Sequence, residues 1–217
     1  MVKEKKGKIK WTESILCVHF NLKSVLSKHP LLEEWLDVSN NLTEAEKAQL
    51  EEHRAELEAN VSFWNEEELK IKFLAFILRM ADYDHSTKYR TYLDRDISAT
   101  VQGEPLLTKA DFMISKGVGD YYTAPYFCFH EFKRKKNADD PIAQVLMAML
   151  ISQEKNKNDK PIYGCYIMGA NWYFMLIQGD TYAQMTSPLR ATNKNELQEI
   201  LLILRKFKVI LETQLQD

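Results

Sequence analysis

The chain is poor in the residues that mark several common protein classes. It has three cysteines in 217 residues, and none stands in a CxxC pair or in a His/Cys cluster with zinc-finger spacing. Scattered cysteines in odd number suit a reducing interior. Glycine and proline are also scarce, with seven and six residues, so extended disorder is not expected. The 45% hydrophobic content predicts one ordinary globular core.

Long apolar runs and targeting signals are missing as well. No segment reaches the roughly 18 consecutive apolar residues that a membrane-spanning helix needs. The first ten residues carry five lysines but no apolar stretch, so they are typical of a basic tail and not of a signal peptide. We therefore expect a cytoplasmic protein with no membrane partner.

Neither sign of charge is in large excess. The formal net charge is -2, which argues against the overall basic surface of a strong non-specific nucleic-acid binder but leaves room for a local basic patch. The patterns GxSxG and GxxxxGK[ST] are absent from the sequence, which argues against the serine hydrolases and the phosphate-loop proteins that carry them.

Hydrophobic periodicity predicts an α/β protein with a helical N-terminal extension. After the tail of residues 1–10, the extension covers residues 11–60, and a larger domain covers residues 61–217. In the extension, a helical segment over 12–38 breaks at Pro30, and a second helix over 43–59 starts with the capping-box pair Thr43 and Glu46. The domain is predicted to contain a helix over 65–80, strands over 97–101, 106–115 and 125–133, a helix beginning at Asp140-Pro141, strands over 161–168 and 172–178, and a helix over 193–214.

Charged residues interrupt two of these apolar strands. Asp111 lies in the run 110–114, and Glu131 and Lys133 lie in the run 126–133. A buried unpaired charge is costly, and Glu131 and Lys133 share one face of their strand. If the two strands form a hairpin, Asp111 lies opposite about Phe129 and diagonal to Glu131. Two carboxylates and a lysine then form a Mg²⁺ or Mn²⁺ site for phosphodiester hydrolysis, or alternatively Asp111 and Lys133 form a salt bridge that closes the sheet.

The order of elements and the placement of these residues resemble the PD-(D/E)XK nuclease superfamily over about residues 61–180. The resemblance implies a restriction-endonuclease-like αβββαβ core, with a mixed central sheet flanked by helices. It also implies a site whose matching positions here are Glu66, Asp111, Glu131, Lys133 and Gln144. Ala110 stands where the family often has proline. Glu68 is an alternative to Glu66, and Gln144 is alternatively a solvated helix residue.

The resemblance implies a metal-dependent DNA endonuclease. Asp111, Glu131 and Glu66 are the expected ligands of the ion, Lys133 orients or deprotonates the attacking water, and Gln144 positions the water or the phosphate. The basic run that follows, Arg134, Lys135 and Lys136, is expected to contact DNA phosphates or to be a solvated strand end. RNA is a possible substrate, a homodimer is a possible assembly, and the alternative function is a non-catalytic nucleic-acid-binding or protein-assembly module.

Overall fold

The computed structural model describes residues 9–83, 88–119, 121–133 and 140–215, with the side chains of residues 118, 125 and 127–133 outside the described part. The helices, in chain order, are α1 (Glu13–Phe20), α2 (Pro30–Leu36), α3 (Glu44–Asn60), α4 (Glu66–Leu69), the π-helix η1 (Lys70–Leu74), α5 (Ala75–Ala81), α6 (Pro141–Asn156) and α7 (Lys194–Gln214). The strands are β1 (Lys23–Ser24), β2 (Arg90–Val101), β3 (Glu104–Val118), β4 (Tyr121–Lys133), β5 (Ile162–Met168), β6 (Asn171–Gln178), β7 (Thr181–Gln184) and β8 (Leu189–Arg190).

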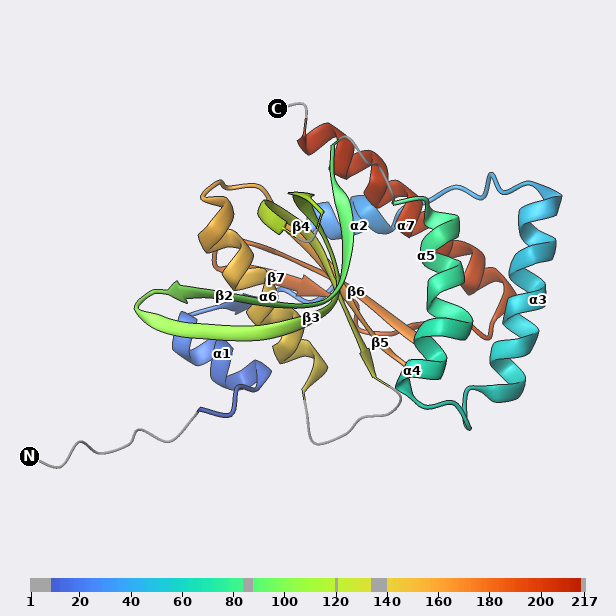
Figure 1. The fold of residues 1–217 in the computed structure, drawn as a ribbon, viewed down its shortest axis with the longest axis horizontal. Coiled ribbons are helices and arrows are strands. Elements are labelled where there is room, and N and C mark those ends of the chain that lie inside the picture. The colour runs from blue at the N-terminus through green and yellow to red at the C-terminus, as the bar shows by residue number, and fades with distance from the viewer. Residues whose placement is uncertain (1–8, 84–87, 120, 134–139, 216–217) are drawn as a thin grey trace, which may run out of the picture.

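The strands of the described residues form one mixed sheet in the order β1-β7-β6-β5-β4-β3-β2, with β8 paired to β6 (Figure 1). Strands β2, β3 and β4 are an antiparallel meander, and β4 pairs with β5 in parallel after the crossover through α6. Strand β6 pairs in antiparallel fashion with both β5 and β7, and β1 pairs in parallel with β7. The expectation of a mixed α/β protein with helices around a mixed sheet is confirmed.

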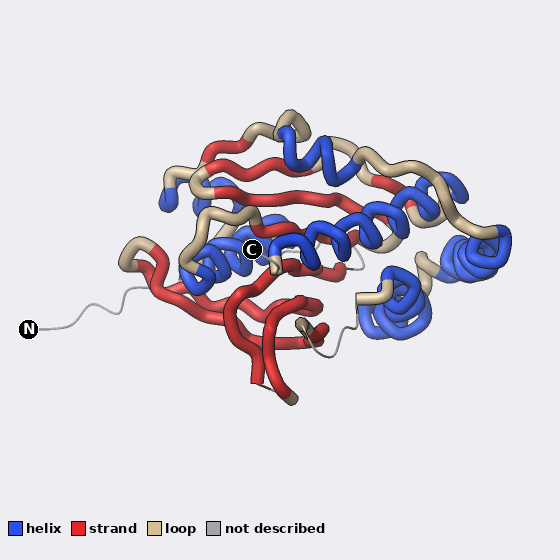
Figure 2. Tube along the Cα trace, turned by 90° about the horizontal axis from the view of Figure 1, so that it is seen from above, coloured by secondary structure: helices blue, strands red, loops and turns tan. Residues whose placement is uncertain are grey.

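Helices lie on both faces of the sheet (Figure 2). Two hydrophobic clusters pack between these helices and the sheet. One cluster joins α2, α3, α5 and α7 to the sheet, and in it Trp35 packs edge-on against Phe174 and donates a hydrogen bond to the Ile203 carbonyl at 3.0 Å. The other joins α1 and α6 to the opposite face, with Leu16 and Met149 fully buried. The N-terminal helices therefore contribute to both sides of the core.

Two helix starts that the sequence predicts are confirmed in atomic detail. Thr43 accepts a hydrogen bond from the Glu46 amide, and the Glu46 carboxylate accepts one from the Thr43 amide at 2.8 Å, which completes the capping box of α3. Asp140 caps α6 by accepting hydrogen bonds from the amides of Ile142 and Ala143, and Pro141 occupies the first helical position.

The prediction of a mainly helical segment over residues 12–38 is wrong in its middle. Helix α1 ends after Phe20 because Asn21 adopts a left-handed backbone conformation, with φ of 54°. The chain then runs along the sheet edge as β1, where Lys23 pairs with Thr181. Pro30 does not simply interrupt a helix but begins α2, since its fixed φ is compatible with the first helical turn.

The meander strands are longer than predicted, and β2 and β3 share an irregularity. Their hairpin turns at Gln102 and Gly103, which both have positive φ, as a tight two-residue hairpin of the primed kind requires. Asp94 also has a positive φ of 53° in the middle of β2. Asp94 and Asp111 lie between the paired residues Leu93↔Phe112 and Arg95↔Ala110. The irregularity thus brings the two aspartates to the same level of the hairpin.

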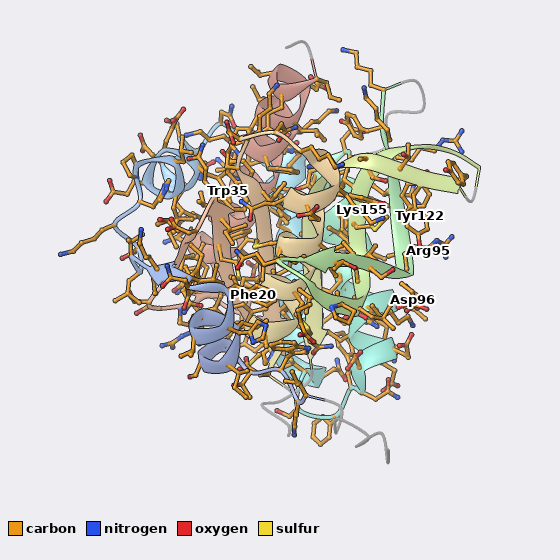
Figure 3. The ribbon with its side chains drawn as sticks, turned by 90° about the vertical axis from the view of Figure 1, so that its left-hand side faces the viewer. Phe20, Trp35, Arg95, Asp96, Tyr122 and Lys155 are labelled. Carbon is orange, nitrogen blue, oxygen red and sulfur yellow. The ribbon has the colours of Figure 1, made fainter. Side chains whose placement is uncertain are left out.

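Bulges set the register between β3 and β4. Ile114 and Lys116 are two residues apart on β3, whereas their partners on β4, Cys128 and Thr123, are five residues apart. Phe129 consequently pairs with Met113, so the expectation that it lies opposite Asp111 is wrong. At the outer end of these strands the Tyr122 hydroxyl donates a hydrogen bond to the Asp96 carbonyl at 2.5 Å, and Figure 3 shows both residues on the side of the molecule away from Trp35.

Candidate functional site

Two of the predicted site residues, Glu66 and Asp111, meet at one cation. The Lys70 ammonium nitrogen lies 3.1 Å from Asp111 Oδ1 and 3.2 Å from Glu66 Oε1. Asp111 lies in β3 and is 8% exposed, whereas Glu66 is the first residue of α4. The helix and the strand therefore present their carboxylates to the same point in space.

Local capping explains why Glu66, and not its alternative Glu68, faces the strands. The Asn65 side chain caps α4 by accepting a hydrogen bond from the Glu68 amide at 2.9 Å, and the Glu68 carboxylate accepts one from the Asn65 amide, also at 2.9 Å. Glu68 is thus engaged at the start of the helix. Glu66 and Lys70 are four residues apart, so they lie on the same side of the helix and pair with each other.

Lys70, which no sequence pattern singled out, lies at the centre of the cluster. Besides Glu66 and Asp111, its ammonium lies 3.4 Å from Glu67 and 4.0 Å from Asp94 of β2. Burial by itself lowers the pKa of Lys70, but the charge of Asp111 and the hydrogen bonds to Asp111 and Glu66 outweigh burial and hold the pKa above its usual value. The signal was present in the sequence as an i,i+4 Glu-Lys pair, but such pairs are common on exposed helix surfaces.

Lys70 also begins the π-helix η1, in which the Ala75 amide donates to the Lys70 carbonyl five residues earlier. A π-helical turn inside an α-helix is uncommon and is frequently found at functional sites. Because the wider turn changes the phase of the helix, it alters how the residues before Lys70 and after Leu74 are aligned on the sheet. The segment predicted as one helix over 65–80 is therefore three consecutive pieces.

A cleft of about 550 Å³ lies directly beside the cluster, between α4, η1 and α5 on one wall and β2 and β3 on the other. Its volume is in the range of small-ligand pockets. Aliphatic and aromatic side chains form half of the lining: Ile71, Leu74, Ala75, Leu78, Tyr83, Leu93 and Phe112. The charged lining residues are Glu67, Lys70, Arg79, Asp82, Asp94 and Asp111. A ligand bound in this cleft would lie in contact with Asp111.

The predicted residues of β4 are described through their backbone. Glu131 pairs with Tyr166 and Lys133 with Met168 in the parallel ladder to β5. The last pair of the β3–β4 ladder is Phe112↔His130, so Asp111 and Glu131 are the next residues on their two strands. The side chains of Glu131 and Lys133 lie outside the described part of the structure, and so do residues Arg134, Lys135 and Lys136.

Gln144 lies on α6, which packs on the opposite face of the sheet from α5. Its amide oxygen is buried and has no hydrogen-bond partner within the part of the chain that the structure describes. A buried acceptor without a donor is unfavourable, so this oxygen is suited to receive a hydrogen bond from a further group.

The donor chemistry of the cluster fits Mg²⁺ or Mn²⁺. Both ions prefer hard oxygen ligands, and Mg²⁺ usually binds through one or two carboxylates and keeps several waters. Glu66 and Asp111 supply two such carboxylates to one point. Within the described residues, no group of three or more histidine, cysteine, aspartate or glutamate side chains is arranged to hold a metal. Glu66 and Asp111 would therefore share the ion with water or with a residue such as Glu131.

Comparison with known proteins adds no relative to this picture. No protein-family model matches the chain, and no curated protein matches it. Across the described ranges, every helix is either too short or too polar to cross a membrane. We therefore infer function from the arrangement of the side chains.

Proposed function

We propose that this protein is a metal-dependent nuclease that hydrolyses phosphodiester bonds in DNA, built on a restriction-endonuclease-like αβββαβ core. The order α4–α5, β2, β3, β4, α6, β5 supports this proposal, with β2–β4 antiparallel and β4 and β5 parallel. The observation that carries the proposal is the convergence of Glu66 and Asp111 on one cation position beside a cleft.

Each residue has a defined part in this proposal. Asp111 and Glu131 hold the ion, and Glu66 binds it directly or through a water. The bound ion supplies a nucleophilic water at neutral pH and offsets negative charge at the phosphate. Lys133 orients the attacking water, and the Gln144 amide positions the water or the phosphate. Arg134, Lys135 and Lys136 contact neighbouring phosphates of the DNA.

The test is cleavage of supercoiled plasmid DNA by the full chain, with Mg²⁺, with Mn²⁺ and with a chelator. We expect nicking that needs the ion and that falls at least about 100-fold in Asp111→Asn and Lys133→Met. Glu52→Gln, at an exposed position on α3, is the matched control and keeps wild-type cleavage. Cleavage that survives chelation, or that is unchanged in Asp111→Asn, contradicts the proposal. A labelled RNA tested in parallel decides between the two nucleic acids.

The second candidate function is a non-catalytic nucleic-acid-binding or assembly module, which one observation favours. Lys70 already provides a positive charge to Glu66 and Asp111, so the fold neutralises part of the cluster from within. Such a protein would bind DNA, or a second copy of the chain, without cleaving it. Retention of labelled DNA in a mobility-shift assay, together with intact plasmid at every metal concentration, is the result that this module predicts.

A further inference from the structure

We propose that Lys70 is an internal competitor of the divalent ion, so that metal binding requires the Lys70 ammonium to leave Glu66 and Asp111 and move into the adjoining cleft. The identity of the ion rests on the proposed function, whereas the competition rests on the geometry of Lys70. The proposal makes Lys70 a regulator of metal affinity, which its appearance as an ordinary helix lysine does not suggest.

The Lys70 ammonium and a divalent ion would overlap in space. Lys70 Nζ lies 3.1 Å from Asp111 Oδ1 and 3.2 Å from Glu66 Oε1. A Mg²⁺ ion ligated by the same two oxygens would stand about 2.0–2.1 Å from each of them. Two positive centres cannot occupy that space together, because they would overlap and repel each other. The ammonium and the ion are therefore alternative occupants of one position.

The cluster around Lys70 is rich in negative charge. Four carboxylates, those of Glu66, Glu67, Asp94 and Asp111, lie within 4.0 Å of Lys70. Lys109 adds one further ammonium, 3.3 Å from Asp94. These carboxylates, drawn together from the described parts of α4, β2 and β3, concentrate negative charge that attracts cations. A dication at Glu66 and Asp111 is favoured electrostatically once Lys70 has moved aside.

The cleft beside the cluster provides space for the displaced Lys70 side chain. Lys70 lines the cleft together with Glu67 and Asp94. The side chains of Glu67 and Asp94 are 70% and 50% exposed and lie on the outer side of the cluster. A lysine side chain has a flexible four-carbon stem, so its ammonium can turn toward these two outer carboxylates without movement of the helix. Lys70 therefore keeps an ion-pair partner in both positions, which lowers the free-energy difference between them.

The experiment is a calorimetric titration of Mn²⁺ into the full chain without DNA, for wild type, Lys70→Met and the control Lys72→Met. Lys72 is the matched lysine because it stands on the same π-helix and lies 3.5 Å from one carboxylate, that of Glu68. If Lys70 occupies the site in nine molecules of ten, the apparent Mn²⁺ affinity is reduced about tenfold. We therefore expect Lys70→Met to bind Mn²⁺ at least about tenfold more tightly than wild type, and Lys72→Met to bind like wild type.

Thermal unfolding gives a second readout. A ligand that binds only the folded state stabilises it by RT ln(1 + [L]/Kd), so a tighter ligand raises the melting temperature more at the same concentration. Addition of Mn²⁺ should therefore raise the melting temperature of Lys70→Met more than that of wild type, and the extra rise should vanish in the double variant Lys70→Met/Asp111→Asn. Lys70→Gln, which keeps a polar side chain, replaces Lys70→Met if the latter does not fold.

The outcomes separate this inference from the nuclease proposal. Equal or weaker Mn²⁺ binding in Lys70→Met, or no Mn²⁺ binding in either protein, overturns the competition. Tighter binding in Lys70→Met together with intact plasmid DNA supports the competition and contradicts the nuclease. Cleavage of DNA with unchanged Mn²⁺ affinity in Lys70→Met supports the nuclease and contradicts the competition.

Discussion

Two cations in this protein are surrounded by carboxylates, but the chain assembles the two sets differently. Arg54 pairs with Glu51 at 2.8 Å and with Glu58 at 2.6 Å, and all three residues lie on α3. Lys70 pairs with carboxylates of α4, β2 and β3, of which Asp111 is 41 residues away. The Arg54 set is an ordinary product of helix spacing, whereas the Lys70 set exists only when the helix packs on the hairpin.

The difference is also one of charge balance and burial. Arg54 has two carboxylate partners and one backbone acceptor, the Thr192 carbonyl at 3.0 Å. Its side chain is 17% exposed, close to the 18% of Lys70, but its partners Glu51 and Glu58 are 41% and 61% exposed. Lys70 faces four carboxylates, and the Asp111 side chain is only 10% exposed. Screening by water weakens the first set more than the second. The comparison teaches that a local ion pair stabilises a helix, while the non-local set holds concentrated charge that is suited to bind a ligand.

The largest expected effect is on stability when each cation is removed. Removing one partner of a buried ion pair leaves an uncompensated charge, so Lys70→Met should lower the free energy of unfolding by about 2–3 kcal/mol, less than for a fully buried pair because Lys70 is partly exposed. Arg54→Met should cost well under half as much, because its partners remain hydrated. Urea denaturation at pH 7 without metal measures both. Equal losses would mean that the two sets do not differ in burial.

A double-mutant cycle sharpens the comparison. Because Asp111→Asn removes a charge that Lys70 neutralises in the wild type, the double variant should recover part of the lost stability, with a coupling free energy of about 1–2 kcal/mol. The cycle Arg54→Met/Glu58→Gln should be close to additive. An additive result for the Lys70 and Asp111 pair would show that their 3.1 Å contact contributes little to stability.

The N-terminal caps of α3 and α4 allow a matched comparison with smaller expected effects on stability. Thr43→Ala and Asn65→Ala each remove a capping box and should each lower the free energy of unfolding by about 1 kcal/mol. Only Asn65→Ala should also weaken Mn²⁺ binding, because Asn65 holds the turn that carries Glu66. Calorimetry on both variants checks this difference, and a loss of Mn²⁺ binding in Thr43→Ala would contradict it.

The smallest expected effect is on the stability of the protein at acidic pH. Hydrogen bonds from the Thr43 amide, the Arg205 guanidinium and the Thr43 hydroxyl lower the pKa of Glu46 to about 2. A lowered folded-state pKa contributes stability above the unfolded value near 4.5, and this contribution is lost as the pH falls from there toward 2. Glu46→Gln should therefore lose less stability than wild type between pH 5 and pH 3, as urea denaturation at both values shows. An identical pH dependence in the two proteins would exclude a role for Glu46 in acid sensitivity.

Much of the secondary structure could be predicted because its causes are local. The start of α6 follows from Asp140 and Pro141, and the capping box of α3 follows from Thr43 and Glu46. The meander strands followed from their apolar residues, although β2 and β4 begin earlier than predicted and β3 is longer at both ends. The edge strand β1 could not be predicted, since its partner Thr181 lies more than 150 residues away. A segment of two residues carries no periodicity of its own.

The candidate site shows the same division. The charges of Asp111, Glu131 and Lys133 stood out because apolar strands rarely contain them, and the side of the helix that carries Glu66 could be inferred from its spacing. The pairing of Asp111 could not be inferred from the sequence, because bulges in β4 shift the register and no residue pattern marked these bulges. Lys70 escaped notice because its pair with Glu66 is also what an exposed helix would show.

The sequence by itself determined most of the segments that become helices and strands and which strands carry charge, since helix caps, turn residues and apolar periodicity act over a few neighbouring residues. Only the tertiary structure decided that Lys70 stands among carboxylates from α4, β2 and β3. That arrangement depends on the positive φ of Asp94, the π-helix at Lys70 and the packing of a helix against a hairpin. Each of these is stabilised by contacts between distant parts of the chain, so none can be inferred from a local pattern.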